Sequence, residues 1–107
     1  MKLDFNREFL NLEGKAIKSP DGNEMTLNVM LGNAIVASAG KEDILKFLDW
    51  GLKLVKGEIL DLDRTDQKLL RKTIEGLETI NILAKGRFLE VMDKKEPETS
   101  ELSAVKD

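Results

Sequence analysis

The sequence lacks three residue types on which much protein chemistry depends: its 107 residues include no cysteine, no histidine and no tyrosine. Without cysteine there can be no disulfide, no thiolate nucleophile and no zinc or iron–sulfur site held by sulfur. Without histidine the chain has neither the commonest general base nor the commonest transition-metal ligand. We therefore predict a protein that is not an enzyme and that binds no cofactor and no metal.

Aromatic residues and positive charge are also in short supply. Aromatic residues make up 5% of the chain, so we expect a core of leucine, isoleucine, valine, methionine and alanine. Lysine and arginine total 17 against 20 acids, which gives a net charge of −3. Proteins that bind phosphate backbones usually carry an excess of basic residues. Nucleic acid is therefore not the partner that the composition favours.

Long apolar runs are absent too. No stretch approaches the roughly 18 apolar residues that a membrane-spanning helix needs, and an acid at Asp4 argues against a signal peptide. We expect a cytoplasmic protein that is not inserted in a membrane. The 41% of hydrophobic and 35% of charged residues are typical of a soluble, folded chain of one domain.

The first quarter of the chain has the pattern of short strands. Alternating residues around Leu3–Phe5 and Lys15–Lys18 predict two strands, paired as a hairpin across residues 6–14. Two strands do not form a stable sheet by themselves. We therefore expect this hairpin to pack on the helices or on another chain.

Helical periodicity begins at Thr26, a good N-cap, and this first helix is expected to end at Gly40. A second helix is predicted from Lys41 to Gly57, with apolar residues almost all round it, which indicates burial on two sides as the central element. Residues 64–94 have helical spacing with an interruption at 76–79, so they form two helices joined by a tight turn or one long kinked helix.

These elements predict an α+β fold that is mainly α, with a short N-terminal β-hairpin packed on three or four helices. Residues 1–94 are expected to form the single domain. Residues 95–107, with one proline, few apolar groups and an acidic balance, are expected to form a disordered tail.

The segment DLDRTD, residues 61–66, concentrates three aspartates and is the best candidate for a metal or acid/base site. An EF-hand loop that began at Asp61 would need glycine at its sixth position and glutamate at its twelfth, where this chain has Asp66 and Lys72. Capping of the next helix by Asp63 or Thr65 fits better. If the protein were an enzyme, Glu58, Asp61 and Asp63 would be the candidate catalytic groups.

Two surfaces are candidates for binding a macromolecule. The first predicted helix is more apolar than one buried stripe requires, and the single tryptophan lies on the second. The excess indicates either core packing or a surface for a protein partner or for a second copy of the chain, with the interface residues Val29, Met30, Val36 and Trp50. The alternative is a nucleic-acid-binding face on the third helix, made by Lys68, Arg71 and Lys72.

Three stretches together, FLNLEGKAI, MTLNVMLGNAIVAS and FLDWGLKLVKGEILDLDRTDQKLLRKTI, resemble small proteins of about a hundred residues encoded by tailed bacteriophages and prophages. The resemblance extends over residues 3–94. It implies a viral accessory protein in the bacterial host cytoplasm, and it brings no catalytic residues. Proteins of this kind act as tail-assembly chaperones, inhibitors of host defence or regulators of transcription. A phage structural protein or a host protein would then be the partner.

Overall fold

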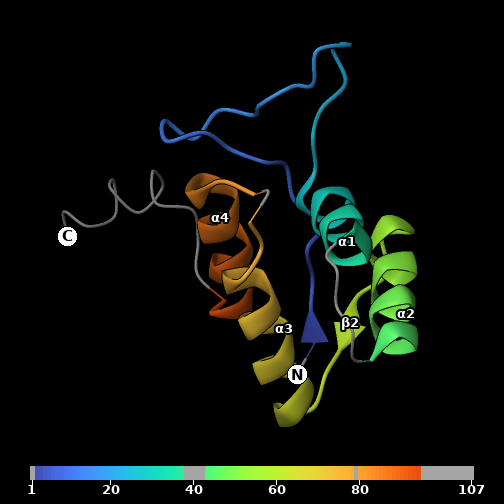
Figure 1. Ribbon diagram of the computed structural model, residues 1–107. Coiled ribbons are helices and arrows are strands. Elements are labelled where there is room, and N and C mark those ends of the chain that lie inside the picture. Colours follow the sequence, from blue (N-terminus) through green and yellow to red (C-terminus); the bar gives the residue numbers. More distant parts are fainter. Residues whose placement is uncertain (1, 38–42, 79, 95–107) are drawn as a thin grey trace, which may run out of the picture.

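Two helical pairs lie on either side of a small two-stranded ladder (Figure 1). The computed structural model describes residues 2–37, 43–78 and 80–94. Its elements in chain order are β1 (Lys2–Leu3), α1 (Leu27–Ala37), α2 (Ile44–Val55), β2 (Leu60–Asp61), α3 (Arg64–Glu75) and α4 (Ile82–Met92). The predicted fold class, α+β and mainly α, is confirmed.

The first strand has a different partner from the one predicted. β1 pairs antiparallel with β2, placing Lys2 opposite Asp61 and Leu3 opposite Leu60, so the expected pairing of Leu3–Phe5 with Lys15–Lys18 is wrong. Leu3 and Phe5 are both fully buried, as their alternation requires. Alternation determines which side of a strand is buried, but it does not determine which segment pairs with it.

A narrow hairpin-like ribbon forms over residues 7–27, with isolated bridges Glu8–Thr26, Leu10–Ala16 and Lys18–Glu24. Three of its residues form a closed ring of backbone hydrogen bonds. Phe9 N donates to Met25 O at 2.8 Å, Met25 N to Ile17 O at 3.2 Å and Ile17 N to Phe9 O at 2.8 Å. This ring folds the ribbon back on itself above the helices (Figure 1).

The helix boundaries follow local signals in the sequence. α1 begins directly after Thr26, and Gly57, with φ +83°, follows the C-cap of α2 in the left-handed conformation that glycine accepts easily. Asp63 caps α3 by accepting from Asp66 N at 2.8 Å. Residues 64–94 form two helices, the first of the two alternatives. Gly40, Lys41 and the predicted tail at residues 95–107 lie outside the described residues.

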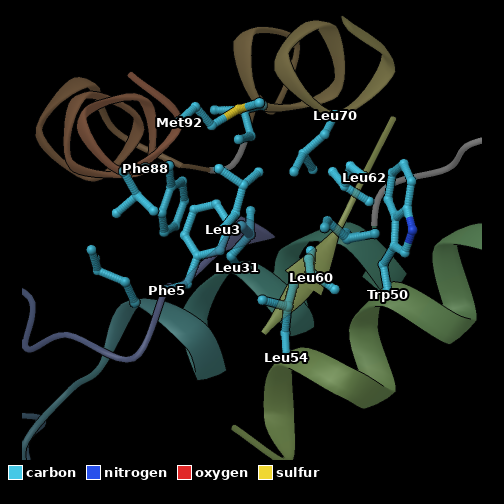
Figure 2. Close-up of a cluster of buried hydrophobic side chains, with 14 of the residues drawn as sticks. Leu3, Phe5, Leu31, Trp50, Leu54, Leu60, Leu62, Leu70, Phe88 and Met92 are labelled. Atoms are coloured by element: carbon cyan, nitrogen blue, oxygen red, sulfur yellow. The ribbon is translucent and has the colours of Figure 1, made fainter. Parts of the chain in front are cut away.

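The core lies between the helical pairs and includes the ladder (Figure 2). Phe88 of α4 lies beside Phe5, and Trp50 of α2 points toward Leu62 (Figure 2). Other fully buried side chains come from α1, α2, β2 and α3: Leu31, Ile35, Leu54, Leu60, Leu70 and Ile74. Because every element contributes to it, this one cluster holds both helical pairs together.

The expectation that α2 is buried on two sides is wrong. Only Trp50, Gly51 and Leu54 are buried in this helix. Its five other large aliphatic residues, on the outer side, are exposed: Ile44, Leu45, Leu48, Leu52 and Val55. α2 packs on α1 and β2 along one side, and no described element covers the other. This uncovered side is the starting point for the functional surface.

Candidate protein-binding surface

Helices α1 and α2 pack against each other unusually closely because glycines face each other at the crossing. A Cβ added to Gly32 would lie 3.0 Å from Gly51 O and 2.9 Å from Val55 Cγ2, and one added to Gly51 would lie 2.5 Å from Val36 Cγ1. No larger side chain fits at either position without displacing a neighbour. The glycine at position 51 therefore allows α1 to pack closely on α2.

A buried hydrogen bond orients the same helix pair. Asn28 Nδ2 donates to Leu54 O at 2.9 Å, near the end of α2, while Gly32 lies against Gly51. Contacts thus run to lower numbers on α2 as they run to higher numbers on α1, so the two helices are antiparallel. With Asn28 satisfied and both glycines in contact, the pair forms a closely packed two-helix layer.

The outer side of this layer carries a row of exposed apolar side chains. We define the α2 seam as Leu45, Leu48, Leu52 and Val55, which follow one another at intervals of three, four and three residues. Their exposed fractions range from 46% to 79%. Soluble monomers seldom expose contiguous rows of large aliphatic side chains. The seam is therefore the candidate binding surface among the described residues.

Other exposed apolar residues adjoin the seam. Ile44 lies in the first turn of α2, and Ile59 follows the seam by four residues, past the end of the helix. On α1, Val29 and Val36 are exposed, and the whole helix has no charged residue. We call the α2 seam together with Val29, Val36 and Ile44 the α1–α2 face.

The four interface residues predicted from sequence differ in their burial. Val29 and Val36 lie on the α1–α2 face. Met30 is half-buried against the core. Trp50 is only 4% exposed. The centroids of the Trp50 and Phe47 rings are 5.5 Å apart, and Lys46 Nζ lies 6.0 Å from the centroid of the Trp50 ring. This burial favours the core alternative for Trp50, so the exposed apolar surface of α2 comes from other residues.

Sequence reasoning missed the residues of the seam itself. Apolar residues all round a helix were interpreted as two buried sides. A second signal was present, since the seam has the three-and-four spacing of a heptad seam, displaced around the helix from the buried Trp50 and Leu54. An interpretation of α2 as two apolar stripes, one buried and one exposed, would have identified the residues of the seam.

The predicted basic face on α3 is only partly available. Lys68 and Lys72 are exposed, but Arg71 forms a forked pair with Asp93, with Nη1 at 2.9 Å and Nη2 at 3.3 Å from its oxygens, and it approaches Glu75 at 3.7 Å. The hydrogen bond that Arg71 donates to Asp93 raises the pKa of Arg71 further. A phosphate would have to compete with these carboxylates.

An open cleft of about 290 Å³ lies beside this ion pair, lined by Arg64, Gln67, Lys68, Arg71, Met92 and Asp93. The lining combines these cations with the Asp93 carboxylate and the apolar side chain of Met92. The cleft thus has mixed charge and lacks the uniformly basic lining expected for a phosphate backbone.

The DLDRTD segment has structural roles. Asp63 is the N-cap of α3, and Asp66 accepts from Lys46 Nζ of α2 at 2.7 Å, which raises the pKa of Lys46. Asp61 belongs to β2. Across residues 2–37, 43–78 and 80–94, no three acidic groups come close enough to hold a metal ion. Within these same ranges, no helix has the length and apolar character to cross a bilayer.

A buried arginine joins the N-terminal ribbon to α4. Arg87 is 5% exposed and donates Nε to Leu10 O at 3.0 Å and Nη2 to Asn11 O at 2.6 Å. Its Nη1 also pairs with Glu90 at 3.1 Å. Arg87 is therefore a structural group that ties the N-terminal ribbon to α4.

Comparison with known proteins adds no relative: no protein-family model, no curated protein and no solved structure matches this chain. The functional argument is therefore based on the geometry of the α1–α2 face and on the residues that make it.

Proposed function

We propose that this protein acts by stoichiometric binding of another protein through the α1–α2 face, as an assembly chaperone, an adaptor or an inhibitor. The observation that supports the proposal is the α2 seam, with four large aliphatic side chains exposed in a row on an otherwise well-packed helix pair. The resemblance to small tailed-phage proteins adds the expectation of a bacterial cytoplasm and of a phage structural protein or a host protein as the partner.

The energetics of the face are suited to a moderate interface. Burying one leucine, isoleucine or valine fully contributes about 1.5–3 kcal/mol. The seam residues are about half exposed or more, so covering them contributes on the order of 5 kcal/mol. Association costs of about 4–15 kcal/mol oppose this gain. The partner must therefore also cover Val29, Val36 and Ile44, or supply polar contacts of its own.

The chemistry of the face favours a helical ligand. Leucine and valine in an i, i+3, i+7, i+10 row on a rigid helix pair form the kind of surface on which an amphipathic helix lays its apolar side. Because α1 carries no charged residue, a partner that covers this border of the face does not have to desolvate an ion there. Carboxylates and lysines are confined to the other border, on α2.

The test compares two substitutions of the same kind. Leu52→Lys places a charge in the seam, whereas Ile82→Lys places one at an exposed apolar residue of α4, outside the α1–α2 face. Tagged wild type and both variants are used to capture proteins from lysates of phage-infected bacteria. A partner identified by mass spectrometry is then purified, and its affinity and stoichiometry are measured by calorimetry.

We expect Ile82→Lys to bind like the wild type and Leu52→Lys to bind at least about tenfold more weakly. Thermal melts of both variants should match the wild type, because neither side chain belongs to the core. Trp50→Ala serves as the opposite control, since it should lower the melting temperature. A partner that binds Leu52→Lys as tightly as the wild type would exclude the α1–α2 face as its site.

A further inference from the structure

The outer turn of the N-terminal ribbon has the sequence SPDGN, residues 19–23. Asp21, Gly22 and Asn23 are exposed in this turn, and the ribbon extends beyond the helices (Figure 1). Among all the aspartates and asparagines of the chain, Asp21 is the only one that a glycine follows. An aspartate before glycine is the most reactive of its kind, because glycine has no side chain to hinder an attack by its own backbone nitrogen.

The backbone of the turn leaves this nitrogen accessible. Gly22 N donates to Ser19 O at 2.9 Å, which closes a β-turn with Pro20 as its second residue. Gly22 has φ +89°, a conformation that glycine adopts easily, and a Cβ added there would meet no atom within 4 Å. The Gly22 amide therefore lies in open surroundings, directly after the Asp21 side chain.

Hydrogen bonds hold the Asp21 carboxylate, and we call them the Asp21 clamp. Asp21 Oδ1 accepts from Ser19 Oγ and from Asn23 N, the latter at 3.2 Å. Asp21 Oδ2 accepts from Asn23 Nδ2 at 3.1 Å. The Ser19 hydrogen bond is the largest cause of a lowered pKa of Asp21, so the carboxyl group is kept ionised.

The reaction open to an aspartate before glycine is cyclisation followed by hydrolysis. The Gly22 nitrogen bonds to Asp21 Cγ, and the carboxyl hydroxyl leaves together with the amide proton as water, which gives a cyclic imide. Water then adds to one of the two ring carbonyls and opens the ring. Opening at the backbone carbonyl of Asp21 gives isoaspartate, in which the chain runs through Cβ and Cγ and the former backbone carbonyl is a free carboxylate. One water is released and one is consumed.

We propose that Asp21 is a modification site, at which isoaspartate forms with water as the only co-reactant, and that the Asp21 clamp slows this reaction in the folded protein. Cyclisation needs a neutral carboxyl group whose Cγ is free to turn toward Gly22 N, and the clamp disfavours both conditions. The inference is independent of the proposed function, because the turn contributes no residue to the α1–α2 face.

The product has a local structural consequence. Isoaspartate adds one methylene group to the backbone between Asp21 and Gly22. The turn is closed by Gly22 N on Ser19 O and by Ser19 N on Asn23 O, the latter at 2.8 Å, and the added atom alters the span of both. We therefore expect the amides of Ser19 and Gly22 to lose protection from exchange in the modified chain.

The test follows isoaspartate in the full chain, kept at neutral pH and body temperature for several weeks. Peptide mapping with electron-transfer fragmentation locates it, and water enriched in heavy oxygen marks each cycle by mass. The variants are Ser19→Ala, Ser19→Thr, which keeps the hydroxyl, and Asp21→Glu, whose longer side chain forms the corresponding imide far more slowly. Thr65→Ala removes an exposed hydroxyl of α3 and is the control. A synthetic peptide of residues 17–25 gives the rate without the clamp, and circular dichroism melts establish that each variant is folded.

We expect isoaspartate at Asp21 of the wild type, at none of its other aspartates, and not at position 21 of Asp21→Glu. Ser19→Ala should convert about two- to tenfold faster than the wild type, because one hydrogen bond to the carboxylate is lost. Ser19→Thr and Thr65→Ala should convert at the rate of the wild type, and the peptide should convert fastest.

Three results overturn the inference. The first is a wild type without isoaspartate at Asp21 after the peptide has converted completely. The second is a wild type that converts as fast as the peptide. The third is a Ser19→Ala variant that converts at the rate of the wild type. None of these results bears on partner binding by Leu52→Lys, so the proposed function is tested separately.

Discussion

The two helical pairs of this protein share one core, but their outer sides differ in chemistry. The α1–α2 pair is held by glycine contacts and a buried amide, and its outer side exposes a row of leucine and valine. The α3–α4 pair has ionic contacts on its outside, with Arg71 bound to Asp93 and Lys85 bound to Glu75 O at 3.1 Å. Among the described residues, α3 exposes no large apolar side chain, and α4 exposes Ile82 alone.

The difference shows that helical content alone does not decide where a small protein binds. Both pairs contribute buried apolar side chains to the core, and both are antiparallel. Only one of them retains apolar surface after the core is filled. The outer side of the α3–α4 pair is mostly polar and suited to contact with solvent, whereas the outer side of the α1–α2 pair retains a row of exposed aliphatic side chains.

The largest expected effect comes from a comparison of a buried leucine in one pair with an exposed leucine in the other. It tests whether the exposed side chains of α2 contribute little to the free energy of unfolding. Leu70→Ala in α3 removes a fully buried side chain and should lower the free energy of unfolding by about 2–5 kcal/mol. Leu52→Ala in the seam should change it by less than about 0.5 kcal/mol. Urea unfolding in dilute solution measures both, without a contribution from association. Equal losses would show that the outer side of α2 is packed.

A matched pair of glycines tests the closeness of packing. Gly32→Ala places a Cβ 3.0 Å from Gly51 O, so we expect a loss of about 1–3 kcal/mol through overpacking. Gly86→Ala in α4 meets no atom within 4 Å and should instead stabilise by up to about 1 kcal/mol, through helix propensity. Thermal melts should therefore move in opposite directions. If both variants were stabilised, α1 and α2 would have to move apart at little cost in free energy, which would contradict close packing at Gly32.

A smaller effect is expected from the ion pair that borders α3 and α4. Removing Arg71 or Asp93 by alanine substitution should cost about 0.2–1 kcal/mol each, because both side chains are more than a third exposed. A double-mutant cycle should give a coupling energy that decreases in about 1 M salt. A coupling energy that does not change with salt would contradict a solvent-screened pair.

The smallest effect is a local dependence on pH in the ribbon. A hydrogen bond and the like charge of Glu24 raise the pKa of Glu8. A raised folded-state pKa means that the contribution of this pair to stability is fully present below the ordinary glutamate value, about 4.3, and is lost as pH rises through the raised value. The protection of the ribbon amides, measured as their exchange rate relative to the intrinsic rate at each pH, should therefore fall across this window.

Glu24→Gln should remove that fall in protection, because the neighbouring carboxylate is then absent. Glu13→Gln, at an exposed glutamate in the turn of the same ribbon, should leave it unchanged. If the wild type and Glu24→Gln showed the same dependence on pH, Glu24 would not be the cause of the raised pKa.

Much of the local structure could be predicted because its signals are local. Asp63 accepts from Asp66 N three residues away, and a glycine in the left-handed conformation follows α2. Such contacts join residues adjacent in sequence, so the chain specifies them wherever the helices lie. The α+β class and the division of residues 64–94 into two helices depend on the same signals.

The candidate site could be predicted only in part. Val29 and Val36 were found because α1 is too apolar for a single buried stripe, and both are exposed. Trp50 was weighed for the same surface, yet it lies in the core. Arg87 holds the ribbon to α4 through carbonyl groups more than seventy residues away, a contact that helical periodicity does not indicate. Periodicity locates apolar stripes on a helix, but it does not say which stripe another element will cover.

The sequence by itself determined the caps, the turns, the amphipathic stripes and the lack of imidazole and thiol chemistry, because each depends on residue type and short-range spacing. Only the tertiary structure decided that β1 pairs with β2, that Trp50 is buried and that the α2 seam is uncovered. These outcomes depend on which segments, far apart along the chain, meet around a limited core. Two stripes on one helix compete for that core, and the protein's own fold had room for only one of them.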